Sequence, residues 1–378
     1  MLHKHLSWVE ISASALRHQM RLFQQYAPSA RIFPVIKSNA YGHGMREVVG
    51  VLDREKSVAG YMVASLDEAL RAASLTRKQV VILSIWQQDQ PLVVRALRRG
   101  IVFPIYDLTA ARWLERLGAR LSRKIPVHIK IDVGTMRLGF RFDDSRAVRQ
   151  VLHMPHLAVT GIFSHFADSE SADEGFTQKQ FTRFQEVVDG LRQEGYVIPM
   201  YHISCSAAAI RGERYHADAI RLGISLYGLW PSDDIKRLYA RKRYIFRPAM
   251  AWKTRIVQIK TVRKGESIGY GLTYRARRGM RIAVLPVGYA DGYDRSLSNR
   301  AHVLVGGKRC PVRGRVCMNL CMIELSRGIA ARVGSPVVLL GRQNDDAITA
   351  AELADKAGTI HYEIVSRISA GIPRIIVP

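Results

Sequence analysis

The sequence predicts an α/β fold, a (β/α)8 TIM-like barrel followed by a mostly β C-terminal domain. Eight short β-rich runs alternate with amphipathic helical segments over about the first 230 residues, and this alternation is typical of such a barrel. From about residue 247 the pattern changes to strand-like runs separated by glycine-containing turns. No glycine-rich dinucleotide fingerprint follows the first strand, which argues against the alternative, a doubly wound open sheet.

The predicted barrel strands are apolar runs that cover residues 31–36, 59–64, 80–84, 101–105, 125–131, 158–163, 200–203 and 219–222. Helices are predicted between or before these runs, for example at residues 12–26, 107–117 and 176–192. Ser12 or Ser14 can cap the first of these helices. In the last one, Phe181, Phe184 and Val188 recur at the spacing of one helix face.

The C-terminal part of the chain is predicted to be a separate β-rich domain. Its strand-like runs cover residues 251–262, 280–287, 301–305, 312–325 and 336–340. Gly306-Gly307 between two of these runs is typical of a β-hairpin turn. The charged stretch 233–247 is predicted to be the linker, so we expect domains at residues 1–240 and 241–378.

The composition is that of a globular protein with an unusual charge. Hydrophobic residues make up 48% of the chain, which is enough apolar surface to offset chain entropy. The 57 Lys and Arg against 32 Asp and Glu give a net charge of +25, which raises nucleic acid or an anionic surface as a partner. The Arg residues are scattered, however, and the densest basic group, residues 237–247, fits no nucleic-acid-binding module. We therefore expect no specific nucleic-acid partner.

Neither a membrane segment nor a metal site is predicted. The longest uncharged stretches, such as residues 195–210, fall short of the roughly 20 apolar residues that a membrane span needs. The N-terminus lacks the apolar core of a signal peptide. Four cysteines at uneven spacing are too few for a disulfide scaffold or a zinc site. The cytoplasm, where thiols stay reduced, is the expected compartment.

The most informative stretch follows the first predicted strand and reads Pro-Val-Ile-Lys-Ser-Asn-Ala-Tyr-Gly-His-Gly from Pro34 to Gly44. A lysine in this place, Lys37, would lie at the carboxyl end of a barrel strand, where barrel enzymes place their chemistry. Desolvation or nearby positive charge would let its amine form an imine with a carbonyl. Taken alone, a lysine after a strand is usually surface charge, but the aromatic residue and two glycines that follow favour a ligand site.

Further stretches occur in order along the chain: 129–140, Ser164-His165-Phe166, His202–Ala207, Arg221–Gly228, Ile268–Tyr274, 286–293, Arg315–Asn319 and 362–374. Together with the Lys37 stretch they closely resemble the alanine racemases over nearly the whole chain. These are pyridoxal-phosphate enzymes with a barrel and a C-terminal β domain. The resemblance implies an isomerase that interconverts L-alanine and D-alanine by removing and returning a proton at Cα.

The resemblance implies a role for each matching residue. Lys37 would hold the cofactor covalently and act as base or acid on one face of the substrate Cα, and Arg137 would steer the substrate carboxylate. His165 would lie near the face of the pyridine ring and Arg221 would point at its nitrogen. The residues expected at the cofactor phosphate are Tyr41, Ser206, Gly223, Ile224 and Tyr362. Individually these have plainer interpretations, because a histidine at a strand end or a buried arginine is more often structural.

Arg221 separates two possible activities. Because an arginine keeps its proton, a pyridine nitrogen beside it should stay unprotonated, which makes the ring a weaker electron sink and disfavours side reactions. Related barrel decarboxylases are implied to carry a carboxylate there instead. Arg221 therefore favours a racemase over a decarboxylase.

The C-terminal domain supplies the second catalytic group that the resemblance implies. Tyr270 would act on the opposite face of Cα from Lys37, as a racemisation with two bases requires. Tyr289 would narrow the entrance and Met318 would offer its backbone amide to the substrate carboxylate. All three would come from the partner subunit, so the resemblance implies a head-to-tail homodimer with shared active sites. On spacing alone, Tyr270 would be interpreted as a half-buried aromatic residue of a strand.

Several points stay open. Asn319 replaces the family's Asp, which allows a broader or different amino-acid specificity, and Thr135-Met136 departs from the usual Met-Gly or Met-Asn. Lys130 occupies a position that is carbamylated in some family members. A non-catalytic pyridoxal-phosphate protein is a further alternative, although such proteins resemble only the barrel half. The sequence does not separate biosynthesis of D-alanine for peptidoglycan from a catabolic role.

Overall fold

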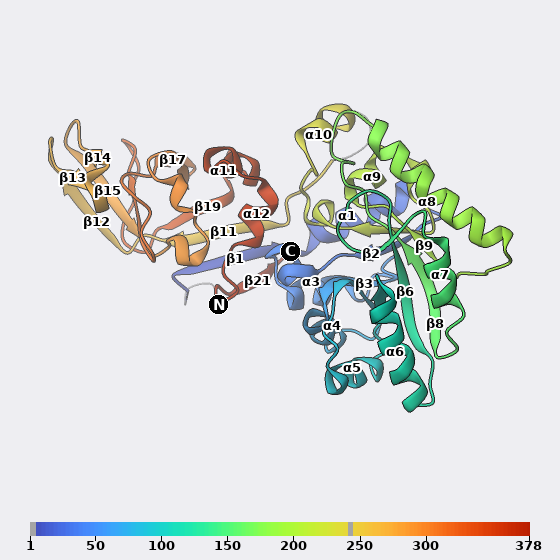
Figure 1. Cartoon of the computed structure of the whole chain (residues 1–378). Helices are drawn as coiled ribbons and strands as arrows, with labels where there is room; N and C mark the ends of the chain where they lie inside the picture. The colour runs from blue at the N-terminus through green and yellow to red at the C-terminus, as the bar shows by residue number, and fades with distance from the viewer. Residues whose placement is uncertain (1–4, 241–244) are drawn as a thin grey trace. The chain divides into compact units, whose positions relative to one another are not determined.

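The computed structural model describes residues 5–240 and 245–378, and the chain forms two compact units. The barrel unit consists of Ala15–Ser38 and Val48–Arg247. The β-rich unit consists of Met1–Ser14, Asn39–Glu47 and Pro248–Pro378. Figure 1 shows the helices and strands of both units with the labels used below.

Within the described residues, eight parallel strands form the wall of the barrel. They are β2 (Arg31–Pro34), β3 (Gly60–Ser65), β4 (Gln79–Ile85), β5 (Phe103–Ile105), β6 (Ile125–Asp132), β8 (Leu157–Phe163), β9 (Tyr201–His202) and β10 (Ala219–Leu222). The ring closes because β10 pairs in parallel with β2, with Arg221 opposite Phe33. These strands read as apolar runs in the sequence because parallel strands are covered on both faces. The predicted barrel is confirmed.

Side-chain caps start some, but not all, of the helices that lie wholly or mostly in the barrel unit. These helices are α1 (Ala13–Tyr26), α3 (Met45–Leu52), α4 (Leu66–Ala73), α5 (Gln90–Leu97), α6 (Leu108–Arg120), α7 (Ser145–Leu152), α8 (Gly175–Gln193), α9 (Ser206–Arg211) and α10 (Asp233–Tyr239). The carboxylate of Asp107, for example, accepts a hydrogen bond from the Ala110 amide at the start of α6, which satisfies one of the free amides of the first turn. The short α2 (Lys37–Tyr41) follows β2.

The β-rich unit contains two sheets and a short hairpin in its described part. The larger sheet has the strand order β17-β16-β19-β11-β1-β21, with β20 paired to β19. Its strands are β1 (Ser7–Ser12), β11 (Met250–Arg255), β16 (His302–Val305), β17 (Lys308–Pro311), β19 (Pro336–Gln343), β20 (Asp346–Ile348) and β21 (Arg374–Val377). The smaller sheet is β12 (Gln258–Val262), β15 (Met280–Leu285) and β18 (Cys321–Glu324), and the hairpin is β13 (Ser267–Ile268) with β14 (Tyr274–Arg275). Two helices, α11 (Ala350–Ala357) and α12 (His361–Ser366), complete the unit.

The structure divides the chain differently from the predicted ranges 1–240 and 241–378. Strand β1 belongs to the β-rich unit, because it pairs with both β11 and β21. The stretch 233–247 is not a simple linker, since residues 233–239 form helix α10 of the barrel unit, capped by Ser232. The predicted boundary and part of the basic group 237–247 fall on residues 241–244, which lie outside the described residues.

Two predictions in the β-rich unit have different outcomes. Gly306 and Gly307 both have positive φ, +58° and +78°, and join β16 to β17 as the predicted hairpin. The run 312–325 is not one strand, because only Cys321–Glu324 is extended in the sheet. The residues before it form turns, and one of these turns carries Met318.

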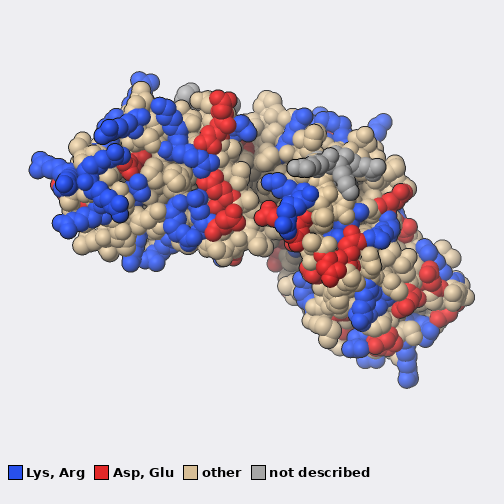
Figure 2. All heavy atoms as spheres, turned by 90° about the horizontal axis from the view of Figure 1, so that it is seen from above, with Lys and Arg blue, Asp and Glu red and all other residues tan. Residues whose placement is uncertain are grey.

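The surface is rich in cations, and Figure 2 shows Lys and Arg side chains spread over the visible face with Asp and Glu among them. No helix in the described part of the chain is both long and apolar enough to cross a membrane. Residues 5–240 and 245–378 also contain no group of three or more His, Cys, Asp or Glu side chains that could hold a metal ion.

Candidate active site

Lys37 is the first residue of α2, directly beyond the carboxyl end of β2. The backbone after it forms a left-handed turn, with φ between 51° and 55° at the four residues 38–41. Such a turn costs roughly 1–2 kcal/mol per L-residue. Strained backbone of this kind persists where the surroundings hold it, often at functional sites. Here the side chain of Asn39 accepts a hydrogen bond from the Met45 amide.

A buried carboxylate, Glu68 on α4, holds the start of this turn within the barrel unit. Its two oxygens accept hydrogen bonds from the Ser38 amide at 2.6 Å and the Ala64 amide at 2.8 Å. Glu68 was not predicted as a site residue from the sequence. Its signal is the pattern Ser65-x-x-Glu68 after a strand, which is typical of a helix start. Ser65 does cap α4, but the Glu68 carboxylate binds the strand ends instead.

The environment of Lys37 favours a neutral amine. Burial lowers the pKa of Lys37 from its ordinary value, and the positive charges of Arg137 and Arg221 lower it further. The negative charge of Glu68 opposes this shift. Because only the unprotonated amine is a nucleophile, these contacts increase the share of the Lys37 amine that can bond a carbonyl carbon.

Arg221 at the end of β10 is buried and donates to several acceptors. Its Nη1 donates to the His202 carbonyl at 3.0 Å, and its Nη2 donates to the carbonyls of Ser164 and Ile203 at 2.8 Å. The Nδ1 atoms of His202 and His165 lie 2.9 and 3.0 Å from the two Nη atoms. An arginine can only donate, so both histidines accept at Nδ1 and carry their proton on Nε2.

A second histidine extends this chain inside the barrel. The Nε2 of His202 lies 3.1 Å from the Nδ1 of His128, so the tautomer fixed by Arg221 makes His202 the donor. Burial lowers the pKa of His202 well below its ordinary value, and Arg221 adds to the effect. Gly161 leaves room for the His128 ring, since a Cβ there would lie 2.7 Å from its Nε2. Nothing in the local sequence indicated that His128 and His202 would meet.

Burial also keeps His165 neutral, because its pKa lies well below the ordinary value of a histidine. Arg221 is the next largest cause. A neutral ring with its proton on Nε2 can pack against a ligand without adding charge.

Ser206, Gly223 and Ile224 lie close to one another in the barrel unit. Ser206 is the first residue of α9, and its Oγ accepts the Gly223 amide at 3.0 Å and the Ser225 amide at 3.4 Å. Ile224 begins a 3-10 turn, η3 (Ile224–Tyr227), immediately after β10. The hydroxyl and the amides of this corner are the donors that an anion would use.

Asp132 at the end of β6 organises the loop that carries Arg137. One carboxylate oxygen accepts the amides of Gly134 and Thr135 at 2.8 and 2.9 Å, and the other accepts the Arg137 amide at 2.9 Å. Burial opposes ionisation of Asp132, but these backbone donors outweigh it and keep its pKa below the ordinary value. Met136 has φ of +51° and is exposed, a conformation that a glycine or asparagine adopts more easily.

Lys130 lies on β6 among the same cations. Its side chain is buried, and its Nζ donates to the Leu83 carbonyl at 3.1 Å and lies 5.4 Å from the centre of the Phe163 ring. Burial, followed by Arg137 and Arg221, lowers the pKa of Lys130 from 10.5 to about 8.

The remaining predicted residues belong to the β-rich unit. The rings of Tyr41 and Tyr362 lie with centroids 6.3 Å apart. Tyr289 and Met318 occupy adjoining turns, since the Ala290 amide donates to the Met318 carbonyl at 3.0 Å. Both side chains are exposed.

Tyr270 lies in a tight turn, η4 (Tyr270–Leu272), between β13 and β14. Positive φ at Gly269 and Gly271 forms this turn. The side chain of Tyr270 is 72% exposed, so the plainer interpretation of a half-buried strand aromatic does not hold. A large aromatic side chain presented on a tight turn is available to another molecule.

In the barrel unit, the carboxyl ends of the strands gather a lysine amine, an arginine with fixed histidines and a corner where the Ser206 hydroxyl meets backbone amides. Barrel enzymes place their chemistry at this face, so the fold and the site define the protein as a barrel enzyme. The alanine racemase N-terminal domain model matches residues 11–231, and the alanine racemase C-terminal domain model matches residues 249–376. The chain belongs to the alanine racemase family, and it is an isomerase.

Relatives and solved structures agree over the full length. The alanine racemase of Carboxydothermus hydrogenoformans is 37% identical over 98% of this chain and 99% of the relative. That of Halothermothrix orenii is 38% identical over 97% and 96%. The crystal structure of alanine racemase from Bacillus anthracis with bound L-Ala-P has a TM-score of 0.89 and 32% identity, covering 99% of this chain and 95% of that chain.

Proposed function

We propose that this chain interconverts L-alanine and D-alanine with pyridoxal 5'-phosphate held on Lys37. The observation that carries the proposal is the Lys37 amine, whose pKa is lowered by burial and by Arg137 and Arg221, at the carboxyl end of a barrel strand. The relatives named alanine racemase and the structure with bound L-Ala-P support alanine as the substrate.

The residues present fit this cofactor. A neutral amine suits its aldehyde, and the Ser206 hydroxyl with the amides of Gly223 and Ile224 suits its phosphate. The cofactor, when bound, withdraws electrons from the substrate Cα and so acidifies the Cα proton. Arg221 can only donate, so it would keep the ring nitrogen unprotonated, and its carbonyl and histidine contacts hold it in place for that role. We place Tyr41 and Tyr362, whose rings lie near each other, at the phosphate as well.

In the mechanism that we propose, two groups exchange protons with Cα from opposite faces. Lys37, with its lowered pKa, takes or returns the proton on one face, and Tyr270 does so on the other. A phenol has an ordinary pKa near 10 and needs neighbouring cations to act as a base. We assign this task to Arg137, whose loop is fixed by the Asp132 carboxylate. Arg137 and the Met318 amide would also bind the substrate carboxylate.

We further propose a homodimer in which the partner subunit's Tyr270, Tyr289 and Met318 complete the site. The exposure of these three large side chains, 72%, 43% and 56%, supports this, because large apolar groups on a surface are typical of an interface. We place the enzyme in the cytoplasm, where it would supply D-alanine for peptidoglycan. A racemase of broader specificity remains the alternative, because Asn319 adjoins Met318.

The test is a chiral assay of the purified protein with L-alanine, D-alanine and other small neutral and basic amino acids, each with and without added pyridoxal phosphate. We expect alanine to be racemised fastest in both directions, with activity that depends on the cofactor. Absence of racemisation while the cofactor is bound would favour the non-catalytic alternative. Equal rates for several amino acids would favour the broader racemase.

A further inference from the structure

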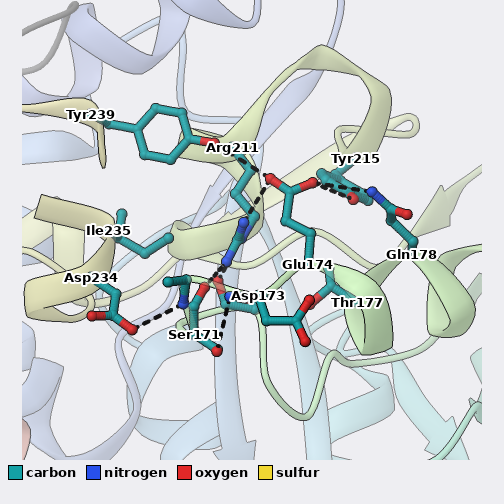
Figure 3. Close-up of polar contacts among 12 residues, drawn as sticks. Ser171, Asp173, Glu174, Thr177, Gln178, Arg211, Tyr215, Asp234, Ile235 and Tyr239 are labelled. Atoms are coloured by element: carbon teal, nitrogen blue, oxygen red, sulfur yellow. Dashed lines mark hydrogen bonds and ion pairs between the residues drawn. The ribbon is translucent and has the colours of Figure 1, made fainter. Parts of the chain in front are cut away.

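An ion pair between Arg211 and Glu174 lies outside the candidate site. It joins helix α9, which begins at Ser206, to the loop after β8. The side chain of Arg211 is fully buried, and its Nη1 lies 2.6 Å from the Glu174 Oε1. Its Nε donates to the Ser169 carbonyl at 2.9 Å, and its Nη2 donates to the Ser171 carbonyl. Figure 3 shows Arg211 reaching from α9 into this loop and Glu174 opposite it. One guanidinium therefore fixes the loop after β8 to helix α9.

We propose that Arg211 and Glu174 are positioning residues for the phosphate end of the cofactor site. The inference rests on the proposed function, because it concerns the pyridoxal phosphate assigned there. Helix α9 runs from Ser206 to Arg211. The ion pair therefore holds one end of this helix, and the Ser206 hydroxyl lies at the other end. Holding Arg211 fixes where the Ser206 hydroxyl meets the Gly223 amide.

The same loop also contacts the other end of α9. The hydroxyl of Ser169 lies 3.1 Å from the sulfur of Cys205, which immediately precedes Ser206. The loop begins at the end of β8, where Ser164 and His165 contact Arg221. A displacement of this loop would therefore move both helix α9, which carries Ser206, and His165, which is expected at the face of the cofactor ring.

Glu174 also accepts hydrogen bonds from residues beyond α9, including one on helix α10. Arg214 pairs with its Oε2, and the hydroxyls of Tyr215 and Tyr239 lie 3.3 and 3.5 Å from its oxygens. Tyr239 lies on α10. On the same helix, the Asp234 carboxylate accepts a hydrogen bond of 2.9 Å from the Ala172 amide. Although burial opposes its ionisation, Arg211 keeps the pKa of Glu174 below the ordinary value. The carboxylate is therefore charged at neutral pH.

The two arginines on Glu174 offer a matched comparison. Arg211 has no exposed side-chain surface, whereas that of Arg214 is 55% exposed. Removing Arg211 takes away the buried donors to the Ser169 and Ser171 carbonyls and to Glu174, and leaving buried acceptors unsatisfied is costly, whereas exposed ion pairs contribute little. Removing Arg211 should therefore displace the loop and α9, and removing Arg214 should not, although both changes delete one positive charge beside the same carboxylate.

The experiment compares Arg211→Gln and Glu174→Gln with the control Arg214→Gln. For each, apo-protein is titrated with pyridoxal phosphate to obtain its Kd, the ³¹P NMR signal of the bound phosphate is recorded, and the Tm of the apo-protein is measured. We expect the Kd to rise at least about tenfold for Arg211→Gln, or about 1.4 kcal/mol, with a shifted or broadened ³¹P signal. Glu174→Gln should change in the same direction, and Arg214→Gln should stay within about twofold of the wild type.

A role as a structural brace alone predicts a different result. It would lower the Tm of Arg211→Gln and Glu174→Gln while the Kd and the ³¹P signal stay at wild-type values, and that result overturns the inference. If Arg211→Gln does not fold, an unchanged Kd for Glu174→Gln overturns it equally. Failure of the proposed function is distinct, because the wild-type protein itself would then not bind pyridoxal phosphate.

Discussion

The buried Lys130 should make the stability of the protein depend on pH in a defined window. Its pKa falls from 10.5 to about 8 in the folded protein. At about 1.36 kcal/mol for each tenfold change in proton affinity, this corresponds to about 3 kcal/mol. The unfolded chain binds the proton more tightly, so the free energy of unfolding should rise as the pH rises from about 8 towards 10.5. Below about pH 8 Lys130 is charged in the folded protein, so the free energy of unfolding is lowered by the full cost of burying that charge.

The perturbation is Lys130→Met, which keeps an unbranched side chain and removes the charge. At neutral pH the variant should gain up to about 3 kcal/mol from removal of the charge. About 1 kcal/mol is lost with the hydrogen bond to the Leu83 carbonyl. The charge contribution should shrink above pH 8 and disappear near pH 10.5, where the wild-type amine is also neutral, so the variant should there be about 1 kcal/mol less stable through the lost hydrogen bond.

The assay is urea unfolding of the apo-protein at fixed pH values from 7 to 10 in buffer free of carbon dioxide, which prevents carbamylation. Lys124→Met is the control, because Lys124 is exposed just before the same strand. The difference between wild type and Lys130→Met should depend on pH, and the difference for the control should not. A difference for Lys130→Met that stays constant across this range would refute the reasoning.

Three further predictions concern single residues. Tyr270→Phe should slow removal of the Cα proton from L-alanine about 100-fold and affect D-alanine far less; equal losses in deuterium exchange would contradict opposed bases. Met136→Gly should raise the free energy of unfolding by about 0.5 kcal/mol, because it relieves the positive φ at that position; a lower urea midpoint would count against this. Asn319→Asp should change selectivity among small amino acids, and an identical substrate profile would remove Asn319 as a determinant.

The barrel was predictable from the sequence because each buried parallel strand leaves an apolar run. Strand β1 was not assigned to the β-rich unit, because its partners are far away in the chain, as in the pairing of Val9 with Trp252. Non-local pairing leaves no local signal. The run 312–325 looked like one strand because it is rich in apolar residues, but Met318 and Leu320 are exposed on turns and only Cys321–Glu324 is a strand.

The site residues also divide into those that the sequence indicated and those that it did not. Ser206 and Gly223 each lie in a stretch that stands out in the sequence, and they are hydrogen-bonded to each other. Glu68 and His128 were missed, because their hydrogen-bond partners lie on other strands and helices, far away in the sequence. The buried Arg211 carried no sequence signal either, since an arginine at a helix end is usually exposed.

Covalent trapping shows directly whether the Lys37 amine binds the cofactor. The wild-type protein is loaded with pyridoxal phosphate, reduced with borohydride and digested, and the modified peptide is identified by mass spectrometry. We expect one pyridoxyl group, on the peptide that contains Lys37, and none in Lys37→Ala. A label on Lys130 or another lysine, or no label in a protein that still racemises alanine, would contradict this assignment.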